Sequence, residues 1–183
     1  VADRSDETAL SAGAPSSRLM WRQCGLLVGL GLLHSACFAV ALWPGVSAFG
    51  LHLLVVPAIW ALAVVVRVAD SQRSISPWRI ALWGAVGVLP FWVFEQTWMT
   101  RIAGVAAVGP LVMAHTLHTF VILWLTIRVR RRWPRLPLWL VFGAIWAGVE
   151  FFRGDIGFDG YPWYFIAHPL IDGWVLRAPA AVV

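Results

Sequence analysis

Five long apolar stretches constrain this chain more than any other feature of its sequence. Each approaches the ~20 residues that a helix needs to cross about 30 Å of hydrocarbon. Unpaired backbone N–H and C=O groups are costly in lipid, so such stretches cross a bilayer as α-helices. The sequence therefore predicts an all-α, polytopic membrane protein, a bundle of about five transmembrane helices at 24–43, 46–68, 80–98, 105–127 and 136–152.

The composition argues against a water-soluble domain. Of the 183 residues, 60% are hydrophobic and only 13% are charged, and the mean hydropathy is +0.77. Soluble domains have roughly 45–50% apolar and about 25% charged residues. The formal net charge of +5 comes from arginines that lie beside the apolar stretches. We therefore expect the basic residues to lie at the membrane surface and not to bind nucleic acid.

The arginines also predict how the chain is oriented. Eleven of the 14 lie before the first stretch or in the connections after the second and fourth stretches. They are Arg4, Arg18, Arg22, Arg67, Arg73, Arg79, Arg128, Arg130, Arg131, Arg132 and Arg135. Because cytoplasmic connections collect positive charge, we expect the N-terminus in the cytoplasm and the chain beyond residue 152 outside.

The two ends of the chain differ from its apolar middle. Residues 1–22 are rich in Ser, Ala and acidic residues, a composition typical of a disordered tail, here cytoplasmic. A cleaved signal peptide is the alternative for the first stretch, but the apolar run is longer than a usual signal core. We interpret it as an uncleaved anchor that begins a transmembrane domain over 23–163. Residues 164–183 are expected to form an outer loop and the start of a sixth helix.

Two tryptophans fall well inside the apolar stretches. Several other Trp residues bracket the stretches, where an indole ring favours the headgroup level. Trp60 and Trp124 lie within the second and fourth stretches. We therefore interpret these two residues as packing against neighbouring helices.

Ionisable residues inside the apolar stretches are candidates for function, because they are costly there. They include His34, His52, His115 and His118, with Glu95 near the end of the third stretch. His115 and His118 share a helix face, so a paired-histidine haem site is one hypothesis. Interhelical hydrogen bonding or placement at the membrane interface is the simpler interpretation. Glu95 fits either the proton relay of a transporter or a residue at headgroup level.

The two cysteines indicate no redox or metal chemistry. Cys24 and Cys37 both lie in the first stretch, where Cys usually acts as a small apolar residue. Their spacing matches no metal-binding or disulfide pattern. We therefore expect neither a metal nor another cofactor.

The most informative motif lies at the end of the fifth stretch. Trp146, Glu150 and Arg153 are followed by the run Gly160-Tyr161-Pro162-Trp163. Glu150 and Arg153 are three residues apart on a helix and can form an ion pair. Gly160 permits an unusual backbone conformation and Pro162 stiffens the aromatic loop. From the residues alone, a loop that braces lipid chains and a simple interfacial anchor are equally well supported.

This order, Trp-x-x-x-Glu-x-x-Arg-Gly and then Gly-Tyr-Pro-Trp, resembles the membrane domain of bacterial apolipoprotein N-acyltransferases, over about 90–183. The resemblance implies a bacterial inner-membrane protein that works on membrane phospholipid and a lipoprotein substrate. An acyl chain would pass from the phospholipid to the lipoprotein amino terminus through a thioester on a cysteine. It also implies a lipid-binding, substrate-binding or structural role for Trp146, Glu150, Arg153, Gly160, Tyr161, Pro162 and Trp163.

In that family the chemistry belongs to a nitrilase-like domain that uses Glu, Lys and Cys. These 183 residues contain no Lys, and both Cys residues lie in the first stretch. No catalytic residue is therefore assigned, and the nitrilase-like domain is absent from this sequence. We expect a fragmentary chain, the membrane-embedded part of a longer enzyme, inactive alone. The alternatives are a non-catalytic lipid- or partner-binding membrane protein and a small transporter.

Overall fold

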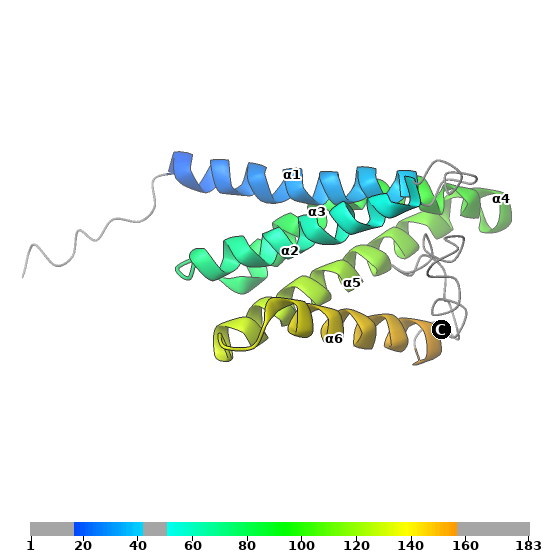
Figure 1. Cartoon of the computed structure of the whole chain (residues 1–183). Helices are drawn as coiled ribbons and strands as arrows, with labels where there is room; N and C mark the ends of the chain where they lie inside the picture. Colours follow the sequence, from blue (N-terminus) through cyan, green and yellow to red (C-terminus); the bar gives the residue numbers. More distant parts are fainter. Residues whose placement is uncertain (1–16, 42–50, 157–183) are drawn as a thin grey trace, which may run out of the picture.

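The computed structural model describes residues 17–41 and 51–156, which are helical apart from short connections (Figure 1). The long helices are α1 (Ser17–Ala41), α2 (Val55–Ser71), α3 (Pro77–Glu95), α5 (Val105–Arg132) and α6 (Leu138–Phe151). Shorter elements are the 3₁₀ helices η3 (Leu51–Leu54) and η4 (Gln96–Met99), the helix α4 (Thr100–Ala103) and the π-turn η5 (Phe152–Ile156). The described part of the chain contains no strand, which confirms the predicted all-α class.

Three of these helices are long and apolar enough to cross a membrane. They are the Trp21–Ala41 part of α1, the whole of α3 and the whole of α5. A spanning helix is taken to need at least 18 residues. α2 has 17 residues and α6 has 14, so both are shorter than that. The structure thus supports a membrane protein with three spanning helices among its described residues. The count of five crossings stays a prediction.

Several helix ends differ from the predicted ones. α1 begins at Ser17, inside the expected disordered tail, because Leu19 and Met20 are good helix formers. α5 continues to Arg132, past the predicted end at residue 127. Arginine has high helix propensity, and cations near a helix C-terminus interact favourably with its dipole. A change from apolar to charged side chains therefore marks the edge of the hydrocarbon and not the end of the helix.

The third predicted helix is modified at both ends. α3 starts at Pro77, where a missing N–H is tolerated in the first turn. It continues through Pro90 to Glu95 and then tightens into η4.

The start of α5 is set by a glycine. Gly104 has a φ of +77° and separates α4 from α5. A side chain would be strained in that conformation, so Gly104 sets the start of α5 at the predicted residue.

The helices form a bundle with two distinct ends (Figure 1). The start of α1, the α2–α3 connection and the α5–α6 connection lie together at one end, called the arginine-rich end here. Its described arginines include Arg22, Arg73, Arg79, Arg131 and Arg135. The last turns of α1, α3 and α6 lie at the opposite end. The described arginines that the sequence assigned to one side of the membrane are thus gathered toward one end of the bundle.

Glycines bring α1 and α3 into close contact. A Cβ atom added to Gly31 would lie 2.4 Å from the carbonyl oxygen of Gly84 and 2.7 Å from the Cα of Gly87. The hydroxyl of Ser35 donates a hydrogen bond to the carbonyl of Gly87 across the same crossing, at 3.1 Å. Small residues let membrane helices approach this closely and gain packing energy. The crossing therefore depends on the absence of side chains at Gly31 and Gly87.

Two arginines fasten α5 to the α2–α3 connection at the arginine-rich end. Arg130 forms an ion pair with Asp70, with 2.7 Å between Nη2 and Oδ2, and also donates to the carbonyl of Leu136. Nη2 of Arg131 lies 3.2, 3.1 and 2.9 Å from three carbonyl oxygens, those of Ala69, Gln72 and Ile75. A helix end leaves such carbonyls without intrahelical donors. Arg131 therefore caps α2 and holds the following turn against α5.

The two tryptophans interpreted as packing residues behave differently. Trp124 is half-buried and its ring stacks on that of Phe120, with centroids 6.5 Å apart. Trp60 is 59% exposed, so the packing interpretation was wrong for this residue. The buried face of α2 carries Ala58 and Leu62, and the helical repeat places Trp60 on the other side.

Candidate functional site

The predicted motif is partly assembled on α6 and the π-turn that follows it. Trp146 and Glu150 are half-buried, and Arg153 is only 4% exposed. The indole N–H of Trp146 donates a hydrogen bond to Oε1 of Glu150 at 2.8 Å. Arg153 belongs to the π-turn, a local widening of the helix that is frequent at functional sites. Gly160, Tyr161, Pro162 and Trp163 lie outside the described residues.

Side chains from four helices line one small cavity beside this motif. Its volume is about 30 Å³, which suffices for about one water molecule. Its polar and indole-bearing lining residues, called the polar cluster here, are His34 on α1, Trp92 on α3, His118 and Thr119 on α5, and Trp146, Glu150 and Arg153 on α6 and η5. The cavity lies in the half of the bundle away from the arginine-rich end, because these residues belong to the later turns of α1, α3 and α6 and to the middle of α5.

His34 links two helices within this cluster. Its Nδ1 lies 3.0 Å from the carbonyl oxygen of Ala58 on α2. Since a carbonyl only accepts, Nδ1 must carry the proton, and Nε2 is left as an acceptor. The His34 ring also lies 6.4 Å from the Trp146 ring. His34 therefore makes the interhelical hydrogen bond that the sequence favoured as the simpler interpretation.

His115 and His118 also face the interior, next to an aromatic row. His115 is 2% exposed, its Nδ1 lies 2.8 Å from the carbonyl oxygen of Leu111, and its ring centroid lies 4.5 Å from that of Trp92. The row continues from Trp92 to Phe91 and on to Phe38, with centroids 4.7 and 5.0 Å apart. The described residues hold no group of three or more His, Cys, Asp or Glu placed to bind a metal. The side chain of His52 lies outside the described part.

The buried guanidinium of Arg153 dominates the electrostatics of the site. A charge at this depth is costly unless a group of opposite sign accompanies it. The carboxylate of Glu150 lines the same cavity and is itself held by Trp146. This arrangement places two side chains of opposite charge around one cavity at the end of α6. It brings no thiol to the cavity: Cys24 and Cys37, both half-buried on α1, do not line it.

The sequence did not predict every member of this site. Trp92 lies in an apolar stretch that contains many aromatic residues, and nothing in its neighbours distinguishes it. Gln96, which is 0% exposed, follows Glu95 at a predicted membrane boundary and could have been noticed as a buried polar residue. The approach of the His34 ring to the Trp146 ring has no sequence signal, because it depends on how several helices pack together in the bundle.

One comparison with known proteins gave a match. Residues 21–183 match the apolipoprotein N-acyltransferase N-terminal domain. Searches among curated proteins and among solved structures gave no match. The matched range contains the whole polar cluster and all the described helices except the first residues of α1. The chain therefore belongs to the family of apolipoprotein N-acyltransferase N-terminal domains.

Proposed function

We propose that this chain is the membrane-embedded part of an apolipoprotein N-acyltransferase of a bacterial inner membrane. Such an enzyme moves an acyl chain from a phospholipid to the amino terminus of a lipoprotein. The observation that carries the proposal is the family match over residues 21–183. The hydrogen bond from Trp146 to Glu150 and the burial of Arg153 support it, because these residues form the motif on which the resemblance rests.

The polar cluster stabilises the described end of α6. Arg153 is buried and lines the same cavity as the Glu150 carboxylate, and a buried charge is costly unless a group of opposite sign accompanies it. The run from Gly160 to Trp163 begins a few residues later. The resemblance implies that this run contacts the phospholipid or the lipoprotein.

The acyl-transfer chemistry uses groups outside these 183 residues. A thioester route needs an activated thiol, a base and a cation that stabilises the oxyanion. The sequence contains no Lys. Cys24 and Cys37 are half-buried within a membrane-spanning helix, a setting that suits packing and not nucleophilic attack. The chain by itself is therefore a platform without catalysis.

A transporter is less well supported by the geometry. The cavity that the polar cluster lines measures about 30 Å³, enough for one water molecule and not for a solute path. Glu95 ends α3 and does not line this cavity.

Expression in a bacterial strain depleted of its own N-acyltransferase tests the proposal. The product of the complete gene should restore growth and yield lipoproteins with three acyl chains, measured by mass spectrometry of their N-terminal peptides. The 183 residues alone should yield only diacylated lipoproteins. Failure of the complete product, despite its insertion in the membrane, would contradict the assigned activity. Acylation by the 183 residues alone would contradict the platform role.

A further inference from the structure

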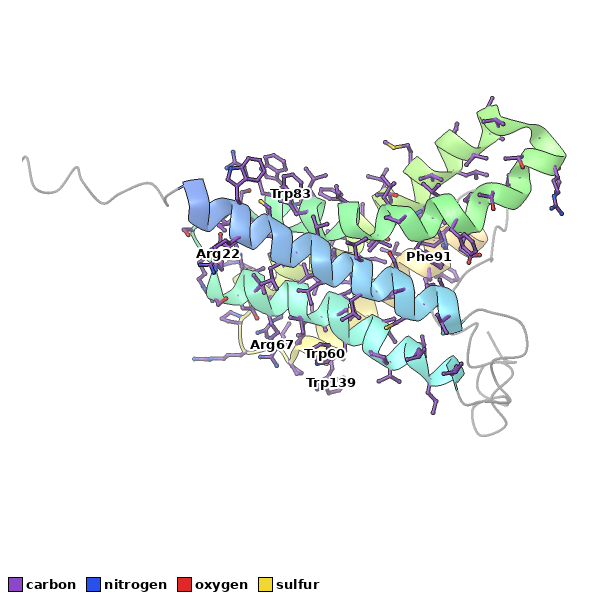
Figure 2. All side chains as sticks on the ribbon, turned by 90° about the horizontal axis from the view of Figure 1, so that it is seen from above. Arg22, Trp60, Arg67, Trp83, Phe91 and Trp139 are labelled. Carbon is purple, nitrogen blue, oxygen red and sulfur yellow. The ribbon has the colours of Figure 1, made fainter. Side chains whose placement is uncertain are left out.

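A groove separate from the polar cluster runs along the outside of the bundle between α2 and α6. Its volume is about 710 Å³, within the range of about 300–1,000 Å³ found for ligand sites. Its walls include Trp60 and Ala63 from α2 and Trp139, Phe142 and Gly143 from α6. Figure 2 shows Trp60 and Trp139 on the same flank of the bundle. No residue lines both this groove and the cavity of the polar cluster.

The groove is apolar along its length and cationic at one end. Arg67, Arg130 and Arg135 line it where it reaches the arginine-rich end, and Figure 2 shows Arg67 close to Trp60. Arg130 is committed to the ion pair with Asp70. Arg67 and Arg135 are exposed. The end of the groove therefore presents positive charge to a ligand, while the remainder presents rings and aliphatic side chains.

The length of the groove matches one leaflet of a bilayer. Along α2 it extends from Val56 to Arg67, a rise of about 16 Å at 1.5 Å per residue. Half of a hydrocarbon core of about 30 Å is about 15 Å. A single acyl chain lying between Trp60 and Trp139 would thus reach from the headgroup level to the middle of the membrane.

We propose that the α2–α6 groove binds an anionic phospholipid. Its phosphate and headgroup lie against Arg67 and Arg135, and one acyl chain lies between Trp60 and Trp139. Guanidinium groups bind phosphate with strong, charge-assisted hydrogen bonds, and basic pockets between transmembrane helices recognise anionic headgroups. A second copy of the chain would bury Arg67 and Arg135 against the same arginines of its partner, a costly contact of like charges. This site goes beyond the proposed acyl transfer and does not depend on it.

Native mass spectrometry of the whole chain tests this proposal. The chain is released from micelles that contain phosphatidylglycerol and phosphatidylcholine in equal amounts, and the retained lipid is identified. The unaltered chain should retain phosphatidylglycerol in preference. Arg67→Gln combined with Arg135→Gln should weaken that binding about 30-fold, because each arginine near an anionic surface contributes about 1 kcal/mol.

The matched control is Arg73→Gln combined with Arg79→Gln. Both residues are exposed near the arginine-rich end, and neither lines the groove. This variant removes the same charge and should bind phosphatidylglycerol as the unaltered chain does. An equal loss in the two double variants would show that general charge attraction, and not the groove, retains the lipid. No loss in either variant would also overturn the proposal.

A second pair of variants tests the proposed position of the acyl chain in the groove without altering charge. A Cβ added at Gly143 or at Gly148 meets no atom within 4 Å, so neither position is blocked at the first side-chain atom. Gly143 lines the groove and Gly148 does not. Gly143→Leu should weaken phosphatidylglycerol binding about tenfold, whereas Gly148→Leu should not. Equal binding by these two variants would overturn the acyl-chain placement. A dimer that Gly143→Leu disrupts would assign the groove to a second copy of the chain.

Discussion

The indole N–H of Trp146 donates to the carboxylate of Glu150, 2.8 Å away and one helical turn further along α6. This bond joins two residues of the sequence motif and turns both toward the cavity that Arg153 also lines. It holds one carboxylate oxygen of a residue that lines the same small cavity as the buried guanidinium of Arg153. The end of α6 is thereby held in a defined geometry before the chain continues.

Replacing Trp146 by Phe tests the contribution of that hydrogen bond. Trp146→Phe keeps an aromatic ring and removes the donor, so it should lower the free energy of unfolding by about 1–2 kcal/mol. Unfolding of the purified chain in mixed detergent micelles, followed by circular dichroism, measures the change. Trp21→Phe is the control, because Trp21 is 66% exposed and lines neither the cavity nor the α2–α6 groove. Equal losses in the two variants would show that ring size matters and the N–H does not.

Adding one methyl group at Gly31 should separate α1 from α3. The new Cβ would lie 2.4 Å from a backbone oxygen of α3, and a backbone atom cannot rotate away as a side chain can. Overpacking of this kind costs about 1–3 kcal/mol. In mixed micelles, Gly31→Ala should therefore unfold at a lower fraction of the denaturing detergent than the unaltered chain.

Gly29→Ala provides the matched control for that experiment. It lies two residues earlier on α1, where an added Cβ meets nothing within 4 Å, and alanine favours helix more than glycine does. This variant should be as stable as the unaltered chain or slightly more stable. A Gly31→Ala variant that matches it in stability would contradict the close crossing of α1 and α3.

Arg131 should matter more than its neighbour in the same basic run. Arg131→Gln removes a guanidinium that contacts three carbonyl oxygens around the α2–α3 connection. We expect a loss of about 2–3 kcal/mol and faster proteolysis within residues 72–76. Arg132→Gln removes the same charge from an exposed side chain and should change stability by less than about 0.5 kcal/mol. Similar cleavage rates in both variants would argue against a capping role for Arg131.

The sequence predicted the helices well because each follows from a continuous run of apolar residues. The contacts between helices join residues that lie far apart in the sequence. The apolar run placed the start of α5 at about Val105, and the arginine bias agrees with the gathering of the described arginines at one end. Helix ends were less predictable, because backbone hydrogen bonding carries α5 to Arg132 beyond the apolar run. The Gly31–Gly87 contact and the approach of His34 to Trp146 depend on interhelical packing, which a single sequence does not encode in any short pattern.

Reporter fusions test the predicted orientation and the crossings made by α3 and α5. Alkaline phosphatase is active only outside the cytoplasm. Joined after Ser74 or after Arg135, at the arginine-rich end, it should be inactive, and joined after Gly104 it should be active. This pattern follows from the rule that arginine-rich connections stay in the cytoplasm. Activity after Ser74 together with inactivity after Gly104 would show the opposite orientation. Activity at all three positions would show that α3 and α5 do not cross the membrane.

Acyl transfer in a purified system tests the central claim most directly. The product of the complete gene, in phospholipid micelles, is supplied with a diacylated lipopeptide that has a free amino terminus. Mass spectrometry then measures the added acyl chain. We expect the peptide to gain one acyl chain from the phospholipid, with a lower rate for the Trp146→Phe enzyme than for Trp21→Phe. A folded, lipid-bound preparation that leaves the peptide diacylated would contradict the assignment of this chain to an N-acyltransferase.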